Sequence, residues 1–205
     1  PDRSTSNREG TKLKYAGSYD DYALVSDEAG SIIMKTTVVR PSTDTTVLVF
    51  AGVRNTADSF ESVLLYHSGS GAWVLKFIAD NGSTNEYIGE STGFSAGTTH
   101  VICARWTSTR AQLMVDGNAA SVLTRTFACT MPGGVSIGNY QNTGIGQPDA
   151  AIGPVVIAPR WVSDEFRDAV MDDDGALLDN RRLLDAYLEP GDYYIPLEDE
   201  DEGET

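Results

Sequence analysis

The residues of this chain with the most obvious chemical potential are its carboxylates, since acidic residues outnumber basic ones by 30 to 15. Two suitably spaced carboxylates can act as nucleophile and general acid in the hydrolysis of a glycosidic bond. The densest set runs from Glu198 to Glu202, but it lies in a terminal acidic stretch without a strand pattern. We therefore predict no catalytic residues, and a glycoside hydrolase is the weakest of the three functions that the sequence suggests.

A second acidic cluster consists of Asp172, Asp173 and Asp174. Calcium needs roughly six to eight converging oxygen ligands, and three adjacent side chains cannot all point at one ion. We expect instead that Asp174 caps a helix and that its neighbours are solvated. His67 and His100 each stand alone in a strand pattern, so structural roles are expected for them. The sequence predicts no metal ligands and no cofactor, and calcium binding stays open.

A better candidate for ligand binding is the polar loop that follows Ile137-Gly138. Polar loops at the rim of a rigid scaffold are common binding sites, although an ordinary polar loop is the alternative. Tyr140 is the aromatic residue expected to be exposed there, whereas Trp73, Trp106 and Trp161 are expected in the core or at its edge. The predicted ligand-binding rim consists of Asn139, Tyr140, Gln141, Asn142 and Asp149.

The two cysteines are too few for a disulfide framework. Cys103 lies in an apolar run and is expected to be a small buried hydrophobic residue. Cys129 lies near a Pro-Gly-Gly turn. Whether the two are bonded stays open, and neither has a histidine at a spacing that suggests a catalytic pair.

The formal net charge of −15 excludes some partners. Nucleic acids and anionic membrane surfaces attract basic faces, so neither is expected to bind this chain. No apolar run approaches the roughly 18 residues of a membrane span. Pro1 fits removal of an initiator methionine and synthesis for the cytoplasm, and a signal peptide cleaved further upstream stays open.

Short strands must position all of these residues. Residues of alternating polarity recur in the segments 32–39, 45–53, 63–67, 73–78, 100–106 and 111–115, with turn residues between them. The pair Asp116-Gly117 between apolar strands predicts a two-residue hairpin turn with positive φ. Such spacing predicts an antiparallel sandwich or barrel, and the apolar content on both faces favours two stacked sheets.

Helices are expected only late in the chain. Ser163 can cap a helix whose first turn holds Asp164 and Glu165, both favoured by the helix dipole. A second helix is predicted over residues 176–188, because its leucines form an apolar stripe before Pro190-Gly191.

The predicted organisation is an N-terminal arm (1–21), a sandwich domain (22–171) and a C-terminal helix with an acidic tail (172–205). An acidic run alone favours disorder. Self-docking or a partner subunit could hold the tail, and we favour a partner. The predicted assembly contact is the apolar segment Tyr193, Tyr194, Ile195, Pro196 and Leu197.

An ordered series of motifs carries a family resemblance. It comprises Leu113-Met114-Val115-Asp116-Gly117, then Val135-Ser136-Ile137-Gly138-Asn139, then the stretch from Ile152-Gly153-Pro154 to Asp164-Glu165. Over residues 22–171 this series resembles the concanavalin A-like lectin/glucanase superfamily, in its laminin G-like or pentraxin-like branch. The resemblance implies an all-β, antiparallel two-sheet jelly-roll sandwich, here with short C-terminal helices and extended terminal arms. It also implies binding of glycans, proteins or calcium at loop rims.

The function expected first is a non-enzymatic module of a larger assembly. We expect a bacteriophage virion accessory protein, either a capsid decoration or a tail or fibre component, whose arms contact capsid or tail subunits. The sandwich would then face outward, the chain would be a homo-oligomer or particle-bound, and glycans could be further partners. The alternative is a secreted, extracellular glycan-binding module that could depend on calcium.

Overall fold

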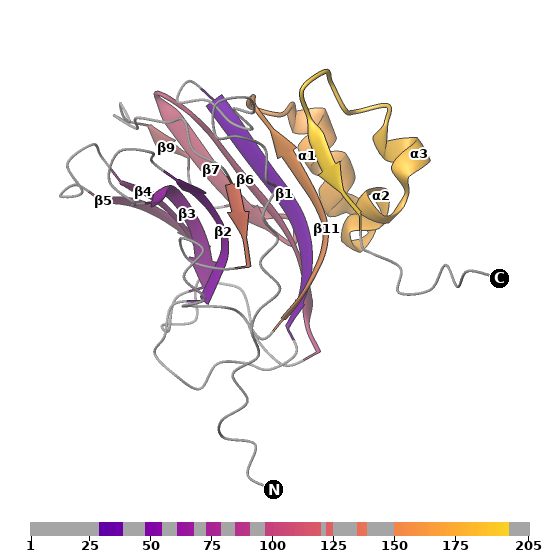
Figure 1. Cartoon of the computed structure of the whole chain (residues 1–205), viewed down its shortest axis with the longest axis horizontal. Coiled ribbons are helices and arrows are strands. Elements are labelled where there is room, and N and C mark those ends of the chain that lie inside the picture. The colour runs from indigo at the N-terminus through magenta and orange to yellow at the C-terminus, as the bar shows by residue number, and fades with distance from the viewer. Residues whose placement is uncertain are drawn as a thin grey trace, which may run out of the picture.

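The computed structural model describes residues 29–38, 48–54, 61–67, 73–78, 85–90, 97–119, 122–124, 135–138 and 150–196 (Figure 1). The predicted N-terminal arm and the acidic run after Pro196 lie outside these residues. No helix among the described segments is long and apolar enough to cross a membrane.

Two antiparallel sheets form the body of the described structure (Figure 1). The larger one has the order β12 (Tyr193–Ile195), β11 (Ala150–Ala158), β1 (Ala29–Val38), β6 (Thr99–Thr107), β7 (Arg110–Val115) and β8 (Asn118–Ala119), and β9 (Leu123–Thr124) also pairs with β7. The smaller one has the order β10 (Val135–Ile137), β2 (Leu48–Arg54), β3 (Glu61–His67), β4 (Trp73–Ile78) and β5 (Asn85–Glu90). The alternating strand pattern therefore predicted the sheet architecture correctly.

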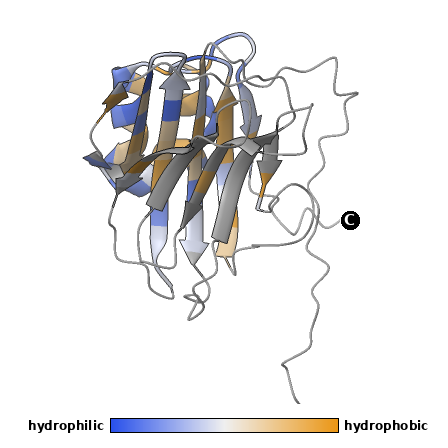
Figure 2. Cartoon of the chain, turned by 90° about the vertical axis from the view of Figure 1, so that its left-hand side faces the viewer, coloured by the Kyte–Doolittle hydropathy of each residue, from blue (hydrophilic) through white to orange (hydrophobic). Residues whose placement is uncertain are grey.

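The main core lies between the two sheets. Ile32, Ile102 and Leu113 of the larger sheet are fully buried, and they share one cluster with Leu65, Ile88 and Ile137 of the smaller sheet. Because strand side chains alternate between faces, the neighbouring residues of the larger sheet point to its other side. Figure 2 shows apolar residues spread along the strands of that sheet, which is expected when both of its faces are covered.

Three short helices and a turn of 3₁₀ helix cover the outer face of the larger sheet (Figure 1). They are α1 (Asp164–Met171), η1 (Asp172–Gly175), α2 (Ala176–Asp179) and α3 (Arg181–Leu184). Phe166, Val170, Leu178 and Leu184 are buried there against β-strand residues such as Val156. This second core holds the helices in place, so part of the predicted C-terminal segment packs on the sandwich.

The first helix begins as predicted. The hydroxyl of Ser163 accepts a hydrogen bond from the Phe166 amide at 3.1 Å, and Asp164 and Glu165 lie in the first turn. Phe166 and Val170 form its buried side.

The single helix predicted over residues 176–188 was wrong. The chain leaves helical geometry at Asn180 (φ −117°, ψ 86°), whose side chain accepts a hydrogen bond from the Leu183 amide and so begins α3. Asparagine competes with the helix in this way because its side chain can replace a backbone partner. The apolar stripe continues across the break, which is why the leucine spacing alone concealed it.

Asp174 is also not the helix cap that its position suggested. The residue that precedes α2 is Gly175, with φ 76° and no side-chain cap, and Asp174 itself has φ 50°. A Cβ on Gly175 would lie 2.8 Å from Val101 Cγ2. The start of α2 is therefore pressed against β6, and glycine satisfies both the positive φ and the close approach.

The turn between β7 and β8 is of the predicted kind. Asp116 has φ 50° and Gly117 has φ 76°, which are the two positive values that a type I′ turn requires. The Asp116 carboxylate also accepts the Val101 amide at 2.8 Å and contacts His100 Nδ1 at 2.7 Å. His100 is buried, and its contact with Asp116 supports the structural role expected from the sequence.

Candidate functional site

A groove of about 840 Å³ lies on the outer face of the larger sheet, beside the helices. Its lining combines apolar surface with charged groups, and it draws on β1, β11, β12, α2 and α3. The lining residues are Lys35, Thr37, Ala151, Gly153, Pro154, Asp179, Arg181, Tyr194 and Pro196. This volume is in the range of small-molecule sites in proteins.

A β-bulge shapes the floor of the groove. Met34 pairs with Val155 and Thr36 pairs with Ile152, so Gly153 and Pro154 together oppose the single residue Lys35. Proline cannot donate to a ladder and is tolerated at a bulge. A Cβ on Gly153 would lie 3.1 Å from the Lys35 carbonyl oxygen, so glycine permits the close approach of the two strands. The bulge therefore sets the position of Lys35.

An ion pair joins the floor to the helical wall. Lys35 Nζ lies 2.5 Å from Asp179 Oδ2, and the two side chains are 23% and 42% exposed. Asp179 is the last residue of α2. The pair therefore holds a donor and an acceptor side by side at the surface of the groove.

Arg181 and Tyr194 form another part of the lining. The Arg181 guanidinium lies 4.9 Å from the centre of the Tyr194 ring, within the range of a cation–π contact. Arg181 Nε donates to Asp185 one turn later at 2.6 Å. The Tyr194 hydroxyl donates to the Leu178 carbonyl at 2.8 Å, and partial burial raises the pKa of Tyr194. The aromatic ring is thus fixed between β12 and α2.

The strand β12, which carries Tyr194, is held by the chain itself. It pairs with β11 through Val155–Ile195, Val156–Tyr194 and Ile157–Tyr193. The preceding turn is anchored by Asp192, whose fully buried carboxylate contacts Arg160 Nη2 at 2.7 Å. The segment predicted to contact a partner subunit therefore docks within its own sheet from Tyr193 to Ile195. Its role in assembly stays a prediction.

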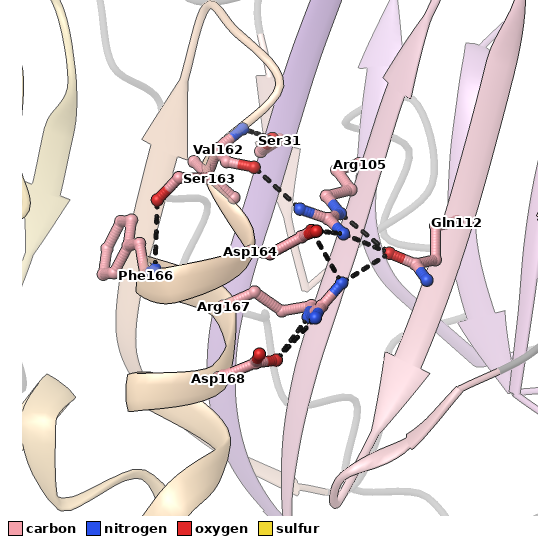
Figure 3. Close-up of polar contacts among 9 residues, drawn as sticks. All are labelled: Ser31, Arg105, Gln112, Val162, Ser163, Asp164, Phe166, Arg167 and Asp168. Carbon is pink, nitrogen blue, oxygen red and sulfur yellow. Dashed lines mark hydrogen bonds and ion pairs between the residues drawn. The ribbon is translucent and has the colours of Figure 1, made fainter.

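A second polar cluster fastens α1 to the larger sheet (Figure 3). Arg105 of β6 is only 2% exposed, and its guanidinium contacts Gln112 Oε1, Asp164 Oδ1 and the Val162 carbonyl. Arg167 reaches the same Gln112 oxygen at 3.2 Å and Asp164 at 2.9 Å. Each guanidinium nitrogen of Arg105 and Arg167 contacts a protein acceptor, so this cluster is a structural junction.

Ser31 and Trp161 complete this junction. The Ser31 hydroxyl donates to the Arg160 carbonyl and accepts the Val162 amide. The guanidinium groups of Arg105 and Arg110 lie 4.4 and 4.0 Å from the centre of the Trp161 ring. The hydrogen bond and charge of Arg105 lower the pKa of Asp164. The junction thereby fixes where the chain leaves β11 and where the helices begin, and so it positions the groove.

The structure describes only some of the residues that the sequence singled out. Asn139, Tyr140, Gln141, Asn142, Asp149, Leu197 and Cys129 lie outside the described residues, so the predicted rim stays a prediction. Trp106 is buried and Trp161 is half-buried, as expected. Cys103 is buried with a free thiol, and burial raises its pKa to about 12. Among the described residues, no three potential metal ligands lie together.

Sequence reasoning did not find Lys35, Asp179 and Arg181. They are far apart in the chain, and isolated charged residues are usually solvated. One signal was available in Gly153-Pro154, because both residues weaken a regular strand and together indicate a bulge. A bulge often redirects a side chain toward a site.

Comparisons with known proteins show which solved structures this architecture resembles. No family model and no curated protein matches the sequence. Among solved structures, the chain is similar to a heptameric SAP-like pentraxin from Limulus polyphemus, with 13% identity over 72% of this chain and 73% of the other, at a TM-score of 0.50. It is also similar to the CBM40 of the Ruminococcus gnavus IT-sialidase bound to α2,3-sialyllactose, with 14% identity, 71% and 83% coverage and a TM-score of 0.53.

A third similar structure is Trypanosoma rangeli sialidase, with 12% identity over 73% of this chain and a TM-score of 0.53. This chain spans only 24% of that sialidase. At these identities the likeness concerns the fold, and it agrees with the two antiparallel sheets and the shared core described above. The chain therefore has the concanavalin A-like jelly-roll fold that its ordered motifs predicted.

Proposed function

We propose that this protein is a non-catalytic, lectin-like module that binds a saccharide in the groove between β11, β12 and the short helices. The observation that carries the proposal is the groove itself, in which an aromatic ring and two prolines lie beside three charged side chains. The fold supports it further, because one similar structure is described as bound to a saccharide.

The lining suits the chemistry of a sugar. A pyranose has an apolar face of C–H groups and a rim of hydroxyls, each of which both donates and accepts hydrogen bonds. Ala151, Pro196 and the Tyr194 ring offer apolar surface, while the Lys35–Asp179 pair offers a donor next to an acceptor. Binding sites typically combine such apolar surface with a few fixed polar groups.

The same lining is unsuited to glycoside hydrolysis. That reaction normally uses two carboxyl groups placed on either side of the scissile bond. Asp179 is the only carboxylate among the described lining residues, and it is already paired with Lys35. These observations support a binding function and not a catalytic one.

The role in a larger assembly is a separate proposal. It rests on the terminal segments of the sequence, and the docking of Tyr193–Ile195 on β11 removes part of its original support. A virion accessory role, with capsid or tail partners, thus has no support beyond the sequence. The extracellular alternative fits a saccharide-binding module equally well.

The experiment that tests saccharide binding is a glycan array followed by calorimetric titration of the best ligand. Tyr194→Leu removes the ring and should weaken binding about threefold to tenfold, since aromatic contacts contribute about 0.5–1.5 kcal/mol beyond their buried area. Tyr193→Leu is the matched control, because neighbouring strand residues face opposite sides. Equal losses in the two variants, or no binding to any glycan, would contradict the proposal.

A further inference from the structure

The groove holds more hydrogen-bond donors than acceptors. Lys35 and Arg181 are two cations against the one carboxylate of Asp179 in the described lining. Elsewhere the chain has the opposite balance, with a net charge of −15. Asp185, outside the lining, accepts a hydrogen bond from Arg181 Nε, so each of the two cations has a carboxylate partner. The distinctive feature of the groove is therefore its supply of unused N–H donors, and not an excess of charge.

The guanidinium group of Arg181 has N–H donors that are open to a ligand. Its Nε is used by Asp185, and its guanidinium lies over the Tyr194 ring. Among the residues that the structure describes, its two terminal nitrogens have no hydrogen-bond partner, and its side chain is 55% exposed. The contact at Nε and the ring beneath hold the planar fork in one orientation. A fork with free terminal nitrogens matches the geometry of a carboxylate.

Lys35 adds a second source of donors. An ammonium group has several N–H donors and no acceptor, and within the described part of the chain Asp179 is the partner of Lys35 Nζ. The remaining N–H groups need an acceptor. Asp179 and Asp185 each accept a hydrogen bond from one nitrogen of their own cation, so the other N–H donors are open to the acceptors of a ligand.

We propose that the groove prefers an acidic saccharide, whose carboxylate binds the Arg181 fork and whose hydroxyls bind the Lys35–Asp179 pair. This inference rests on the proposed saccharide-binding function and specifies the class of ligand. Charge-assisted, bidentate hydrogen bonds are roughly twice as strong as neutral ones. A neutral sugar would leave the terminal nitrogens of Arg181 without a charged acceptor.

The first test compares ligands on one array that carries sialylated, uronic and neutral saccharides. The best acidic ligand is then titrated beside its methyl ester, which keeps the sugar and removes the charge. We expect the ester to bind about tenfold more weakly or worse, because a hydrogen bond to a charged group contributes about 1.5–3 kcal/mol. Equal affinity for acid and ester would overturn the inference and leave saccharide binding intact. No binding to any saccharide would overturn both.

The second test compares two neighbouring arginines. Arg181→Gln should lower the affinity for the acidic ligand about tenfold. The affinity for the methyl ester should stay within about twofold of the wild-type value. Arg182→Gln removes the same charge from an exposed residue outside the groove lining and should change neither. Equal effects of the two variants would show general charge attraction and overturn the assignment to Arg181.

The third test separates a sugar carboxylate from a peptide carboxylate. A glutamate-rich peptide of matched charge is titrated under the same salt conditions. We expect it to bind more weakly than the acidic saccharide, because it lacks the hydroxyls that the Lys35–Asp179 pair can bind. Tighter binding of the peptide would overturn the saccharide as the preferred class of ligand.

Discussion

Lys35 on β1 and Asp179 on α2 are 144 residues apart in sequence, and their side chains meet at 2.5 Å on the outer face of the larger sheet. The pair exists because a bulge at Gly153-Pro154 sets the position of Lys35 and because the helices are fixed by their own core. It joins the two halves of the groove and places a donor beside an acceptor. The proposed function depends on this relationship.

Removing either member of this pair should affect binding more than stability. Lys35→Met keeps the aliphatic stem, and Asp179→Asn keeps the shape, so each should cost at most about 1 kcal/mol of folding free energy. Each should weaken saccharide binding about tenfold, because the partner left behind can no longer share a hydroxyl group. Calorimetry and urea unfolding measure the two effects. Arg182→Met is the control, and a large stability loss without a binding loss would identify the pair as structural only.

The hairpin turn after β7 gives a prediction about stability. Gly117 has φ 76°, and a Cβ there would meet no atom within 4 Å, so the cost of Gly117→Val is conformational. A β-branched residue at positive φ should destabilise the fold by about 1–3 kcal/mol. Ser108→Val, in the neighbouring turn without positive φ, should have little effect. Equal thermal melting temperatures for Gly117→Val and the wild type would contradict the turn geometry.

Local patterns predicted much of the fold. The alternating segments became strands, Asp116-Gly117 formed the expected turn, and Ser163 capped α1. Each of these features is decided by a few neighbouring residues, so the sequence is sufficient. The prediction of one helix over residues 176–188 was wrong because the leucine spacing continued across Asn180. There the backbone leaves helical geometry, and the Asn180 side chain caps a new helix, α3.

The groove could not be predicted in the same way. Its charged residues come from β1, α2 and α3, and only the pairing of distant strands and the packing of the helices bring them together. Two residues of the predicted contact Tyr193–Leu197, Tyr194 and Pro196, line the groove, and Tyr193–Ile195 pairs with the chain's own sheet. Self-docking was the alternative that the sequence left open, and an isolated apolar segment does not reveal which surface covers it.

The arginine junction predicts a strong dependence of stability on one buried side chain. Arg105→Met should destabilise the protein by about 2–4 kcal/mol, because the buried Val162 carbonyl and Gln112 amide lose a charged donor. Arg110→Met removes only an exposed cation that contacts the Trp161 ring and should cost less than about 1 kcal/mol. Urea unfolding of both variants is the measurement. Similar losses would mean that the Trp161 stacking, and not the hydrogen bonds, holds the junction.

The same junction predicts a pH dependence. Arg105 lowers the folded-state pKa of Asp164 below the usual value of 3.8. The pair therefore contributes stability above pH 3.8, and this contribution is lost as the pH falls through the folded pKa. The stability difference between the wild type and Asp164→Asn should be constant above about pH 5 and should shrink below 3.8. A difference that stays constant down to the acid transition would contradict the pairing with Arg105.

Cys103 should be unreactive while the protein is folded. Its thiol is buried and free, and its pKa is raised to about 12, whereas the thiolate is the reactive form. In a Cys129→Ser background, an aromatic disulfide reagent at pH 8 should leave the native protein unlabelled. The same reagent should label Cys103 fully in guanidinium chloride. Rapid labelling of the native protein would show that β6 opens far more readily than its burial indicates.

The central claim is that a saccharide binds in the groove beside Lys35, Asp179 and Tyr194. An NMR titration of the ¹⁵N-labelled protein with the best ligand from the glycan array tests it most directly. We expect the amide signals of Lys35, Gly153, Asp179 and Tyr194 to shift together with one dissociation constant. Shifts confined to the loop from Asn139 to Asp149, or no shifts with any glycan, would contradict the account.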